Sequence, residues 1–373
     1  MISSLIVREY SARTLPREFL SGWEELENRS LEGNAFLSHH FVLPALRHLP
    51  TEVDKNPIVL AVESAHGGEL LGLGIFEACP GTRLLPLRHL RSWKSTHTFL
   101  DGILLDRDRA EEAAVALFQW LRQQGSRWHG IAFQDRSTGS ELSAVLEKSA
   151  SRCGISWQED GWTERASVLT SRVPDDCVKE LYSKRRSKDL SRRFRILEAF
   201  GDVRFELNHC ETGHQTPLET LLRMEAMGWR GERKEALQSH PGHERFAREM
   251  VAGLSAVGQV LFCELSVDGE PVSSALFLRS GKTLFAFKSG WDPQFARCSP
   301  GVLTKVRLME SLKGLDGIEM ADGCAVPGSW LETYWPWRRR LTTGVLPTTS
   351  AGSLAVNATL RLKRVKRWVQ GVS

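Results

Sequence analysis

A single carboxylate interrupts the apolar face of a predicted helix over Leu218–Trp229. Apolar residues recur there at helical spacing, at Leu218, Leu221, Leu222 and Trp229. Glu225 lies on the same stripe. Burial beside a tryptophan raises the pKa of a carboxyl group, which suits a general base that takes a proton from an ammonium or a hydroxyl. The same pattern fits a structural ion pair with an arginine, and both interpretations stay open.

A second carboxylate, Asp322, ends a predicted strand over Ile318–Asp322 and is followed by Gly323 and Cys324. Open α/β sheets build their sites at the carboxyl ends of strands, so we expect Asp322 and Cys324 to point into one crevice. A nucleophilic cysteine would need a nearby histidine, and none lies close to Cys324 in the sequence.

The histidines do not form a metal motif. The candidate groups are His209, Cys210 and His214, and the pair His240 and His243. Both lack the paired ligand spacing of a zinc site. We therefore expect no metal.

A helix start after the predicted strand Thr283–Ser289 has the composition of an anion site. The sequence there is Ser299-Pro300-Gly301, in which serine fits the N-cap, proline the first helical position, and glycine keeps the surface low beside free backbone N–H groups. Aligned N–H dipoles at such a start favour a pyrophosphate. The alternative is a helix cap without a ligand, and the short motif does not decide between the two.

Cationic residues are concentrated in three places. One predicted helix carries Lys184, Arg185, Arg186, Lys188, Arg192, Arg193 and Arg195, the C-terminus carries Arg361, Lys363, Arg364, Lys366 and Arg367, and Trp335-Pro336-Trp337 precedes Arg338, Arg339 and Arg340. Such clusters attract phosphates, carboxylates or anionic lipid surfaces. Solvated helix faces and a buried tryptophan pair are the alternatives. The net charge of +4 is too small by itself to indicate nucleic acid.

The elements that must position these residues occur twice in the chain. VLAVESAHGGELLGLGIF, from Val59, is echoed without a gap by VLFCELSVDGEPVSSALF, from Val260. Each copy has the form of a β-hairpin, and each is followed by an apolar strand, an amphipathic helix and a short strand that ends in Asp. The helices are Ala110–Arg122 and Val302–Lys313, and the short strands are Ile131–Asp135 and Ile318–Asp322. The sequence therefore predicts two copies of one α/β unit.

Further elements follow from periodicity and capping residues. We expect strands at Leu5–Tyr10, Val203–Leu207 and Leu341–Leu346, an extended segment at Ser156–Val173, helices at Arg17–Arg29, Phe41–Leu49, Glu141–Arg152 and Glu244–Val257, and a basic amphipathic helix at the end of the chain. A long helix is predicted at Cys177–Ala199, capped by the turn Val173–Asp176 and closed by Gly201.

Length and composition suit two packed globular domains. The chain has 373 residues, of which 41% are hydrophobic and 25% charged. We place the domains at 1–165 and 166–373, with the basic helix in the second. No apolar run approaches the ~18 residues that cross a bilayer, and the N-terminus lacks a signal-peptide core. Seven cysteines without a CxxC pair indicate thiols in a reducing cytoplasm.

The second half, from about Tyr182 to Leu346, resembles the tandem-GNAT acyltransferases described as BioF2-like or CelD-like, relatives of the FemABX peptidyl transferases. The segments that carry the resemblance are SKRRSKDLSRRFRILE, GWRGERKEAL, SPGVL and DGCAVPGSWLETYWPWRRRL. The chain departs from the family where Arg230 replaces a lysine, where Lys234-Glu235-Ala236 replaces Gly-Thr-Ala, and where Gly323 replaces a serine. The first half matches through NAFLSHHF and HTFLDGILLD, from Asn34 and His97.

The resemblance implies two tandem GNAT domains, each a mixed α/β sheet with helices on both faces, and an acyl-CoA as co-substrate. Its pyrophosphate would lie at the helix that starts at Ser299, and an oxyanion donor would be a backbone N–H on the splayed strand. The implied cofactor-binding residues are Phe287, Lys288, Ser289, Ser299, Pro300, Gly301 and Val302. The usual GNAT pyrophosphate pattern is absent here, as on the FemABX side of the superfamily, some of whose members use aminoacyl-tRNA.

Together these observations predict a cytoplasmic acyl-CoA-dependent N-acyltransferase. Its acceptor would be an amino group of a small-molecule or lipid-linked sugar or amino-acid-like molecule, in polysaccharide or cell-envelope biosynthesis. The assigned residues are Glu225 or Asp322 as base, Cys324 or Tyr334 as proton donor, and Trp229, Arg230, Trp335, Arg338 and Arg339 at the acceptor. The alternatives are FemABX-like aminoacyl transfer from tRNA and a catalytically degenerate binding module. A peripheral contact of the C-terminal helix with an anionic membrane is a further expectation.

Overall fold

The computed structural model describes residues 5–49, 56–209 and 216–369, with the backbone alone described at 216, 229, 230 and 364–369. The chain divides into two compact units. The first comprises residues 1–39, 51–163 and 340–373, and the second comprises residues 40–50 and 164–339.

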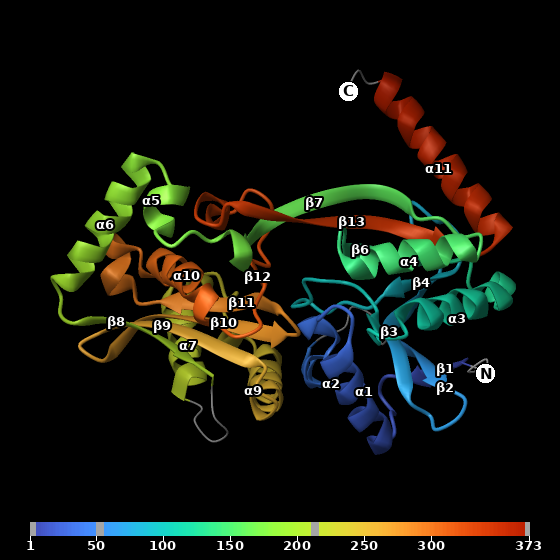
Figure 1. Cartoon of the computed structure of the whole chain (residues 1–373), viewed down its shortest axis with the longest axis horizontal. Coiled ribbons are helices and arrows are strands. Elements are labelled where there is room, and N and C mark those ends of the chain that lie inside the picture. The colour runs from blue at the N-terminus through green and yellow to red at the C-terminus, as the bar shows by residue number, and fades with distance from the viewer. Residues whose placement is uncertain (1–4, 50–55, 210–215, 370–373) are drawn as a thin grey trace. The chain divides into compact units, whose positions relative to one another are not determined.

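The first unit is a mixed sheet covered by helices (Figure 1). Its strands lie in the order β1-β2-β3-β4-β6-β13, with β5 on β3. They are β1 (Leu5–Ser11), β2 (Ile58–Ser64), β3 (Leu70–Cys79), β4 (His89–Ser92), β5 (Leu104–Leu105), β6 (Gly130–Ser137) and β13 (Trp337–Pro347). The helices of this unit are α1 (Arg17–Arg29), α3 (Ala110–Gln123), α4 (Glu141–Arg152) and α11 (Ser350–Val369). Leu117, Phe118 and Leu121 of α3 pack into its core.

The second unit is built in the same way, with strands in the order β7-β12-β11-β10-β9-β8. They are β7 (Gln158–Leu169), β8 (Val203–Asn208), β9 (Val260–Val267), β10 (Glu270–Ser280), β11 (Thr283–Trp291) and β12 (Met320–Asp322). Its helices are α2 (His39–His48), α5 (Cys177–Leu181), α6 (Lys184–Glu198), α7 (Thr216–Met227), α8 (Trp229–Glu232), α9 (Pro241–Ala256) and α10 (Pro300–Ser311). Helices α7 and α9 lie on one face of the sheet, and α10 and α6 on the other (Figure 1).

Short 3₁₀ turns join these elements. They are η1 (Ala35–Leu37), η2 (Gly125–Arg127), η3 (Thr170–Arg172), η4 (Leu237–Ser239), η5 (Pro293–Cys298), η6 (Leu312–Gly314) and η7 (Trp330–Thr333). Among the described residues, none of the helices has the combined length and apolar character needed to cross a bilayer.

The internal repeat is present in the fold. Both predicted hairpins form, as β2–β3 and β9–β10. In each unit the next strand pairs antiparallel with the hairpin and, through a helical crossover, parallel with a later strand, β4 with β6 and β11 with β12. The parallel step after an antiparallel run makes both sheets mixed, as predicted.

The predicted long helix over Cys177–Ala199 is wrong in one respect, because two helices take its place. The side chain of Asp176 accepts a hydrogen bond from the Lys179 N–H and caps α5, as expected. A second cap follows at Ser183, whose side chain accepts from the Arg186 N–H and starts α6. Two start signals within eight residues favour a break over one continuous helix.

Two segments belong to a different unit from the one that the predicted domain boundary at 165/166 gives them. Residues 40–50 belong to the second unit, where Phe41 of α2 packs edge-on against Phe246 of α9, with ring centroids 5.3 Å apart. Residues 340–373 belong to the first unit, where β13 pairs antiparallel with β6. The basic helix α11 is therefore part of the first unit.

Candidate active site

Glu225 is the buried carboxylate that the sequence pattern singles out. Its side chain is fully buried, and Oε2 accepts a hydrogen bond of 2.9 Å from the backbone N–H of Leu237. Oε1 has no hydrogen-bond partner among the described residues, although Lys288 Nζ lies 3.7 Å away, within ion-pair distance. A buried carboxylate oxygen without a donor is costly and therefore calls for an explanation. It can accept a proton or a hydrogen bond from a ligand.

Gly290 sets the position of Glu225 on the sheet. A Cβ atom at Gly290 would lie 2.6 Å from the backbone N of Glu225 and 2.8 Å from the carbonyl carbon of Met224. The backbone of α7 therefore touches β11 at a point where only glycine fits. This contact holds Glu225 beside Lys288, which lies two residues before Gly290 on β11.

We expect Gly290→Ala to push α7 away from β11 and to lower both stability and turnover, because the new methyl group has backbone atoms as its nearest neighbours. Overpacking of this kind costs about 1–3 kcal/mol. Chemical denaturation and steady-state kinetics of the purified variant measure the two effects. The matched control is Gly314→Ala, where nothing lies within 4 Å of the added Cβ. Equal stability and equal turnover of the two variants would contradict the argument that close contact at Gly290 excludes a side chain.

The strand β11 carries a β-bulge beside Glu225. Lys288 pairs with Leu276 and Ala286 with Phe277, so Phe287 is the extra residue of the bulge. A bulge withdraws a residue from the ladder and re-aims its neighbours. As a result, Phe287 and Lys288 contact the same helical layer, Phe287 through Phe246 of α9 and Lys288 through Glu225. The bulge lies within the predicted segment Phe287–Ser289.

Two histidine rings lie close together at the start of α9. The rings of His240 and His243 at the start of α9 lie 5.3 Å apart. Burial lowers the pKa of His243, and the charges of His240 and Lys288 lower it further. His243 is thus held in its neutral form near the site.

Asp322 occupies a different environment, between two arginines. Its carboxylate is fully buried and accepts hydrogen bonds from Arg165 Nη2 at 2.6 Å and Arg339 Nη1 at 2.9 Å. Burial alone would raise the pKa of Asp322, but the charges of Arg165 and Arg339 outweigh it and lower the pKa. A carboxylate held this firmly in its ionised form is a weak proton acceptor. Of the two predicted bases, the geometry therefore favours Glu225.

The remaining predicted residues near Asp322 have structural contacts. The Cys324 N–H donates to Asp322 Oδ1 at 3.0 Å. Burial raises the pKa of the Cys324 thiol, as does the Asp322 carboxylate. Tyr334 packs in the core cluster on the α10 face, where its carbonyl oxygen accepts from the Tyr182 hydroxyl at 2.7 Å. Trp335 is fully buried on Phe277 in the same cluster.

The predicted acceptor-binding arginines also have partners within the protein. Arg338 Nη1 donates to the carbonyl oxygen of Trp335 at 2.9 Å, and its Nη2 lies 3.3 Å from Glu332 Oε2. Arg339 is buried against Asp322. The side chains of Trp229 and Arg230 lie outside the described residues, as do Cys210 and His214 of the rejected metal motif.

The predicted anion site offers fewer backbone amides than expected. Ser299 is the N-cap of α10 in a left-handed conformation, with φ of 50° and no hydrogen bond from its side chain to the helix. Pro300 has no N–H, and the Val302 and Leu303 amides donate to the Ser299 carbonyl oxygen. Gly301 is the remaining amide of the turn. Its lack of a side chain also makes room for Trp291, whose ring carbon would lie 3.3 Å from an added Cβ.

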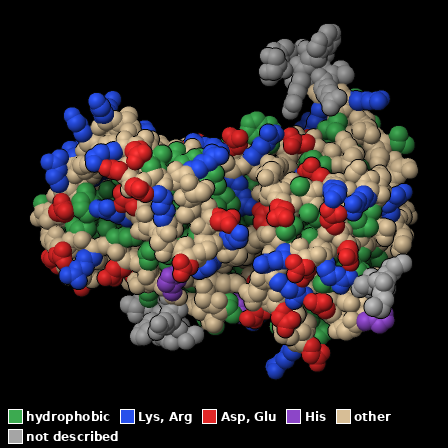
Figure 2. All heavy atoms as spheres, in the orientation of Figure 1, with side chains coloured by type: hydrophobic (Ala, Val, Ile, Leu, Met, Phe, Trp, Pro, Cys, Tyr) green, Lys and Arg blue, Asp and Glu red, His purple; other side chains and the backbone are tan. Residues whose placement is uncertain are grey.

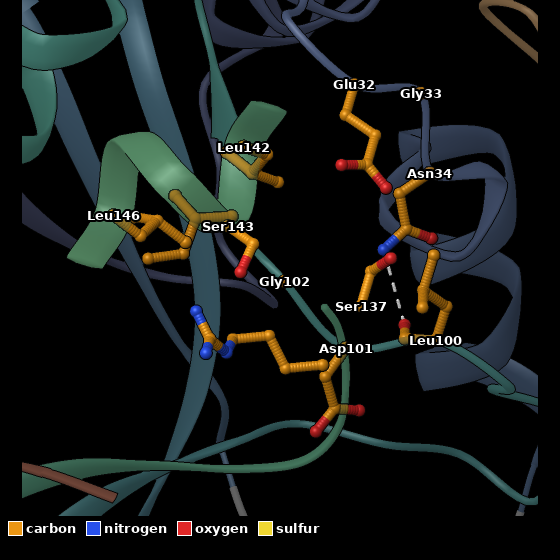
Figure 3. Close-up of a pocket in the computed structure, with 12 residues that line it drawn as sticks. Glu32, Gly33, Asn34, Leu100, Asp101, Gly102, Ser137, Leu142, Ser143 and Leu146 are labelled. Carbon is orange, nitrogen blue, oxygen red and sulfur yellow. Dashed lines mark hydrogen bonds between the residues drawn. The ribbon is translucent and has the colours of Figure 1, made fainter. Parts of the chain in front are cut away.

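Polar side chains also meet in a small pocket of the first unit, shown in Figure 3. The two sequence segments that carry the first-half resemblance meet here, because Asn34 Nδ2 donates to the Leu100 carbonyl oxygen at 3.3 Å (Figure 3). Asp101 accepts at 2.6 Å from the Gln134 N–H. The free volume of about 10 Å³ holds at most about one water molecule. We assign no substrate to this pocket.

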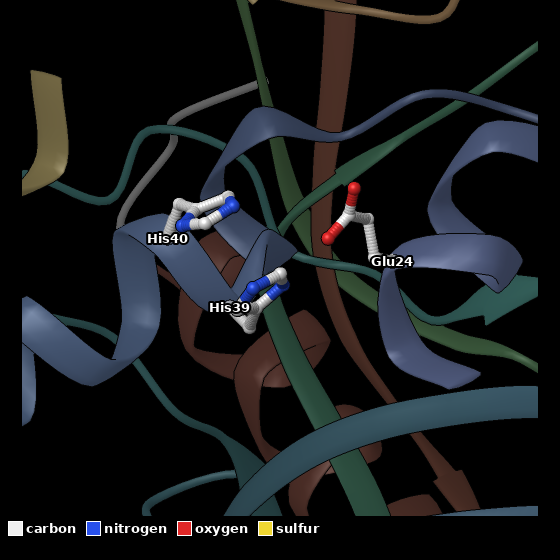
Figure 4. A group of neighbouring side chains, drawn as sticks. All are labelled: Glu24, His39 and His40. Atoms are coloured by element: carbon white, nitrogen blue, oxygen red, sulfur yellow. The ribbon is translucent and has the colours of Figure 1, made fainter. Parts of the chain in front are cut away.

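Glu24 and His39 of the first unit have ligand atoms within 4.8 Å of each other (Figure 4). Structural zinc sites use four ligands, and His39 Nδ1 lies 3.4 Å from Glu27 Oε1. The next residue, His40, starts the part of α2 that belongs to the second unit, where its ring packs on Gly253. We assign no metal to these side chains.

Comparison with known proteins identifies the fold. Residues 183–325 match the family model described as an acetyltransferase (GNAT) domain. The second unit contains a GNAT domain. No curated protein sequence matches the chain.

Solved structures similar to the whole chain share its fold. FemX superposes with a TM-score of 0.56 at 11% identity, over 93% of this chain and 98% of FemX. The C-terminal domain of a putative lysylphosphatidylglycerol synthetase from Agrobacterium fabrum gives a TM-score of 0.51 at 14% identity, over 94% and 96% of the two chains. A protein of unknown function from Bacteroides thetaiotaomicron gives a TM-score of 0.53 at 13% identity, over 87% of this chain and 97% of the other. The predicted mixed α/β fold is thus confirmed, and the predicted GNAT resemblance is confirmed for residues 183–325.

Proposed function

We propose that the GNAT domain transfers an acyl group from acyl-CoA to an amino group of a sugar or amino-acid-like acceptor. The observation that carries the proposal is the buried Glu225 carboxylate, whose Oε1 lacks a hydrogen-bond partner among the described residues and lies beside the bulge of β11. A base beside the backbone of an irregular strand is the arrangement that direct acyl transfer to an amine needs.

In the proposed reaction, Glu225 Oε1 takes a proton from the acceptor ammonium. The free amine attacks the thioester carbonyl carbon, and the carbonyl oxygen becomes an oxyanion near the backbone N–H groups of the bulge at Phe287. Collapse of this intermediate breaks the C–S bond. The CoA thiolate takes up the proton that the attacking nitrogen loses, and Glu225 returns its proton to water. Lys288 Nζ lies 3.7 Å from Glu225 Oε1, within ion-pair distance of the proposed base.

The raised pKa of Cys324 makes its thiol a weak acid for the last protonation, and Tyr334 packs in the cluster on the opposite face of the sheet. We therefore no longer assign the proton donor to either residue. Gly301 and the dipole of α10 are the groups that this turn offers to the CoA diphosphate.

The second candidate function is aminoacyl transfer. It is favoured by the structural likeness to FemX and to a lysylphosphatidylglycerol synthetase domain, and by the basic residues of α6. Charged tRNA would then be the donor, and its binding would fall steeply with salt.

The two candidates are separated by the donor. We expect the purified chain to release heat on titration with acetyl-CoA or a longer acyl-CoA, and mass spectrometry to detect acylated product from a panel of amino sugars and amino acids. Transfer from charged tRNA without transfer from any acyl-CoA would replace the first proposal by the second. A degenerate binding module would give neither heat nor product with either donor.

A further inference from the structure

The second unit contains a ligand-sized cavity that the proposed reaction does not use. It has a volume of about 310 Å³ and lies between α5, α6 and α10. Small-molecule pockets have volumes of roughly 300–1,000 Å³, so this space exceeds an ordinary packing defect. It opens on the α10 face, whereas Glu225 lies under α7 on the other face.

The walls of the cavity are mainly apolar. They are formed by Val178 of α5, Leu190 and Phe194 of α6, and Leu303 and Val306 of α10. Apolar walls that face water are unfavourable, and a ligand that displaces this water buries them. The lining indicates a hydrocarbon group as that ligand.

Cations surround this apolar space. Arg195 and Arg307 line it, and Arg307 stacks on Phe194 at 4.5 Å while it pairs with Glu310 at 2.8 Å. The outer surface of α6 adds exposed Lys184, Arg185, Arg186, Lys188 and Arg192. Lys and Arg side chains gather over this end of the second unit in Figure 2. Among the described residues no ion pair involves Arg185, Lys188 or Arg195, so their charge is available to an anion.

An exposed aromatic residue lies near the same helix. Trp330 of η7 is 51% exposed and packs on Tyr334, which in turn packs on Tyr182 at the junction of α5 and α6. Tryptophan beside a basic amphipathic helix is typical of surfaces that contact the lipid headgroup region.

We propose that this face of the second unit docks on an anionic phospholipid bilayer, with one acyl chain in the α5–α6–α10 cavity and phosphates against α6. Apolar walls bordered by Arg195, Arg307 and the exposed cations of α6 match a lipid, whose hydrocarbon and phosphate are joined in one molecule. A nucleic acid would match the cations alone. This docking surface is independent of which acyl donor the GNAT domain uses.

The experiment is flotation of the full chain with vesicles of phosphatidylcholine, with and without phosphatidylglycerol. We expect flotation only with the anionic vesicles. The double variant Arg185→Glu/Lys188→Glu should bind more than tenfold more weakly, since each basic residue near an anionic surface contributes roughly fivefold. The matched control reverses two exposed cations elsewhere on the unit, Arg204→Glu/Lys282→Glu, and should float like the parent.

A second variant tests the cavity itself. Ser191→Trp places a ring from an exposed position into the cavity, and Ala199→Trp adds an exposed ring at the end of α6 outside it. We expect the parent and Ala199→Trp to keep part of their vesicle binding in high salt, and Ser191→Trp to lose it. Thermal unfolding of each variant checks that the fold is intact.

The proposal would be overturned if the chain did not float with anionic vesicles, or if Ser191→Trp bound vesicles in high salt as well as the parent. It would also be overturned if the chain bound a soluble fatty acid but not vesicles. Binding to tRNA that the Arg185→Glu/Lys188→Glu variant abolishes, with flotation unchanged, would indicate a nucleic acid as the partner instead.

Discussion

Replacement of Glu225 by glutamine is expected to lower kcat/KM by about 10²- to 10⁴-fold, the usual contribution of a general base. Glutamine has the same shape and can still accept the Leu237 N–H through its amide oxygen, but it cannot take a proton. The affinity for acyl-CoA should change little, because the carboxylate acts on the acceptor amine. Steady-state kinetics with isothermal titration of the donor separate the two quantities.

The matched control for this prediction is Glu264→Gln. Glu264 is a partly buried carboxylate of β9 in the same unit, where burial raises its pKa and Asn208 Nδ2 donates to it at 2.9 Å. It has no proposed part in the reaction, so its replacement should leave kcat/KM within about twofold. Unchanged turnover in Glu225→Gln would remove the base assignment, and equal losses in both variants would indicate a general effect of buried charge.

The sequence predicted the location of Glu225 but not its partners. Helical periodicity placed the carboxylate on the apolar face of α7, since burial on one face is a local property of the helix. Lys288 and the Leu237 N–H approach from other elements, and no periodicity encodes those contacts. Gly290 reads as an ordinary strand glycine until α7 is seen against it.

The same limit applies to the strand β11. The resemblance indicated a splayed strand near Phe287, and the bulge is found there. Without the bulge, side-chain alternation would have placed Phe287 and Lys288 on opposite faces of the sheet. A one-residue change of register depends on pairing with β10, which local composition does not fix.

Segment exchange between the units was beyond local patterns as well. The helix near Phe41–Leu49 was predicted, but not that Phe41 would pack on Phe246 and Phe287, about two hundred residues later. The strand near Leu341–Leu346 was predicted, but its partner β6 lies in the first half of the chain. Both contacts follow from tertiary packing, because each element could bury its apolar face against either unit.

Asp322 illustrates how a correct location can suggest an incorrect role. The strand end was predicted, and a carboxylate there was taken as a possible base. Arg165, 157 residues earlier in the chain, and Arg339 convert it into the centre of a buried ion cluster. Position in the strand cannot distinguish a proton acceptor from a permanent anion, since the difference lies in distant cations.

We expect Asp322→Asn to lower the free energy of unfolding by about 3–5 kcal/mol, because it removes the carboxylate charge that two buried guanidinium groups share. Asparagine keeps an acceptor for the Cys324 N–H, so the loss reports the charge. Urea denaturation at neutral pH measures it. The matched control is Glu319→Gln, which removes one charge from the exposed pair with Lys282, 2.6 Å apart, and should cost less than about 1 kcal/mol.

Two further measurements distinguish an ion cluster from simple loss of packing. The variant Arg165→Met/Asp322→Leu/Arg339→Met removes all three charges and should recover most of the stability, since replacing a whole buried ion group by apolar side chains often leaves the stability unchanged.

The second measurement is the pH dependence of stability. The arginines lower the folded-state pKa of Asp322, so its stabilisation is present above the unfolded pKa of about 3.9 and is lost as the pH falls through the folded pKa. The stability difference between the parent and Asp322→Asn should therefore be constant near neutrality and shrink below about pH 4. A difference that persists in acid would contradict the assignment of Asp322 as a permanent anion.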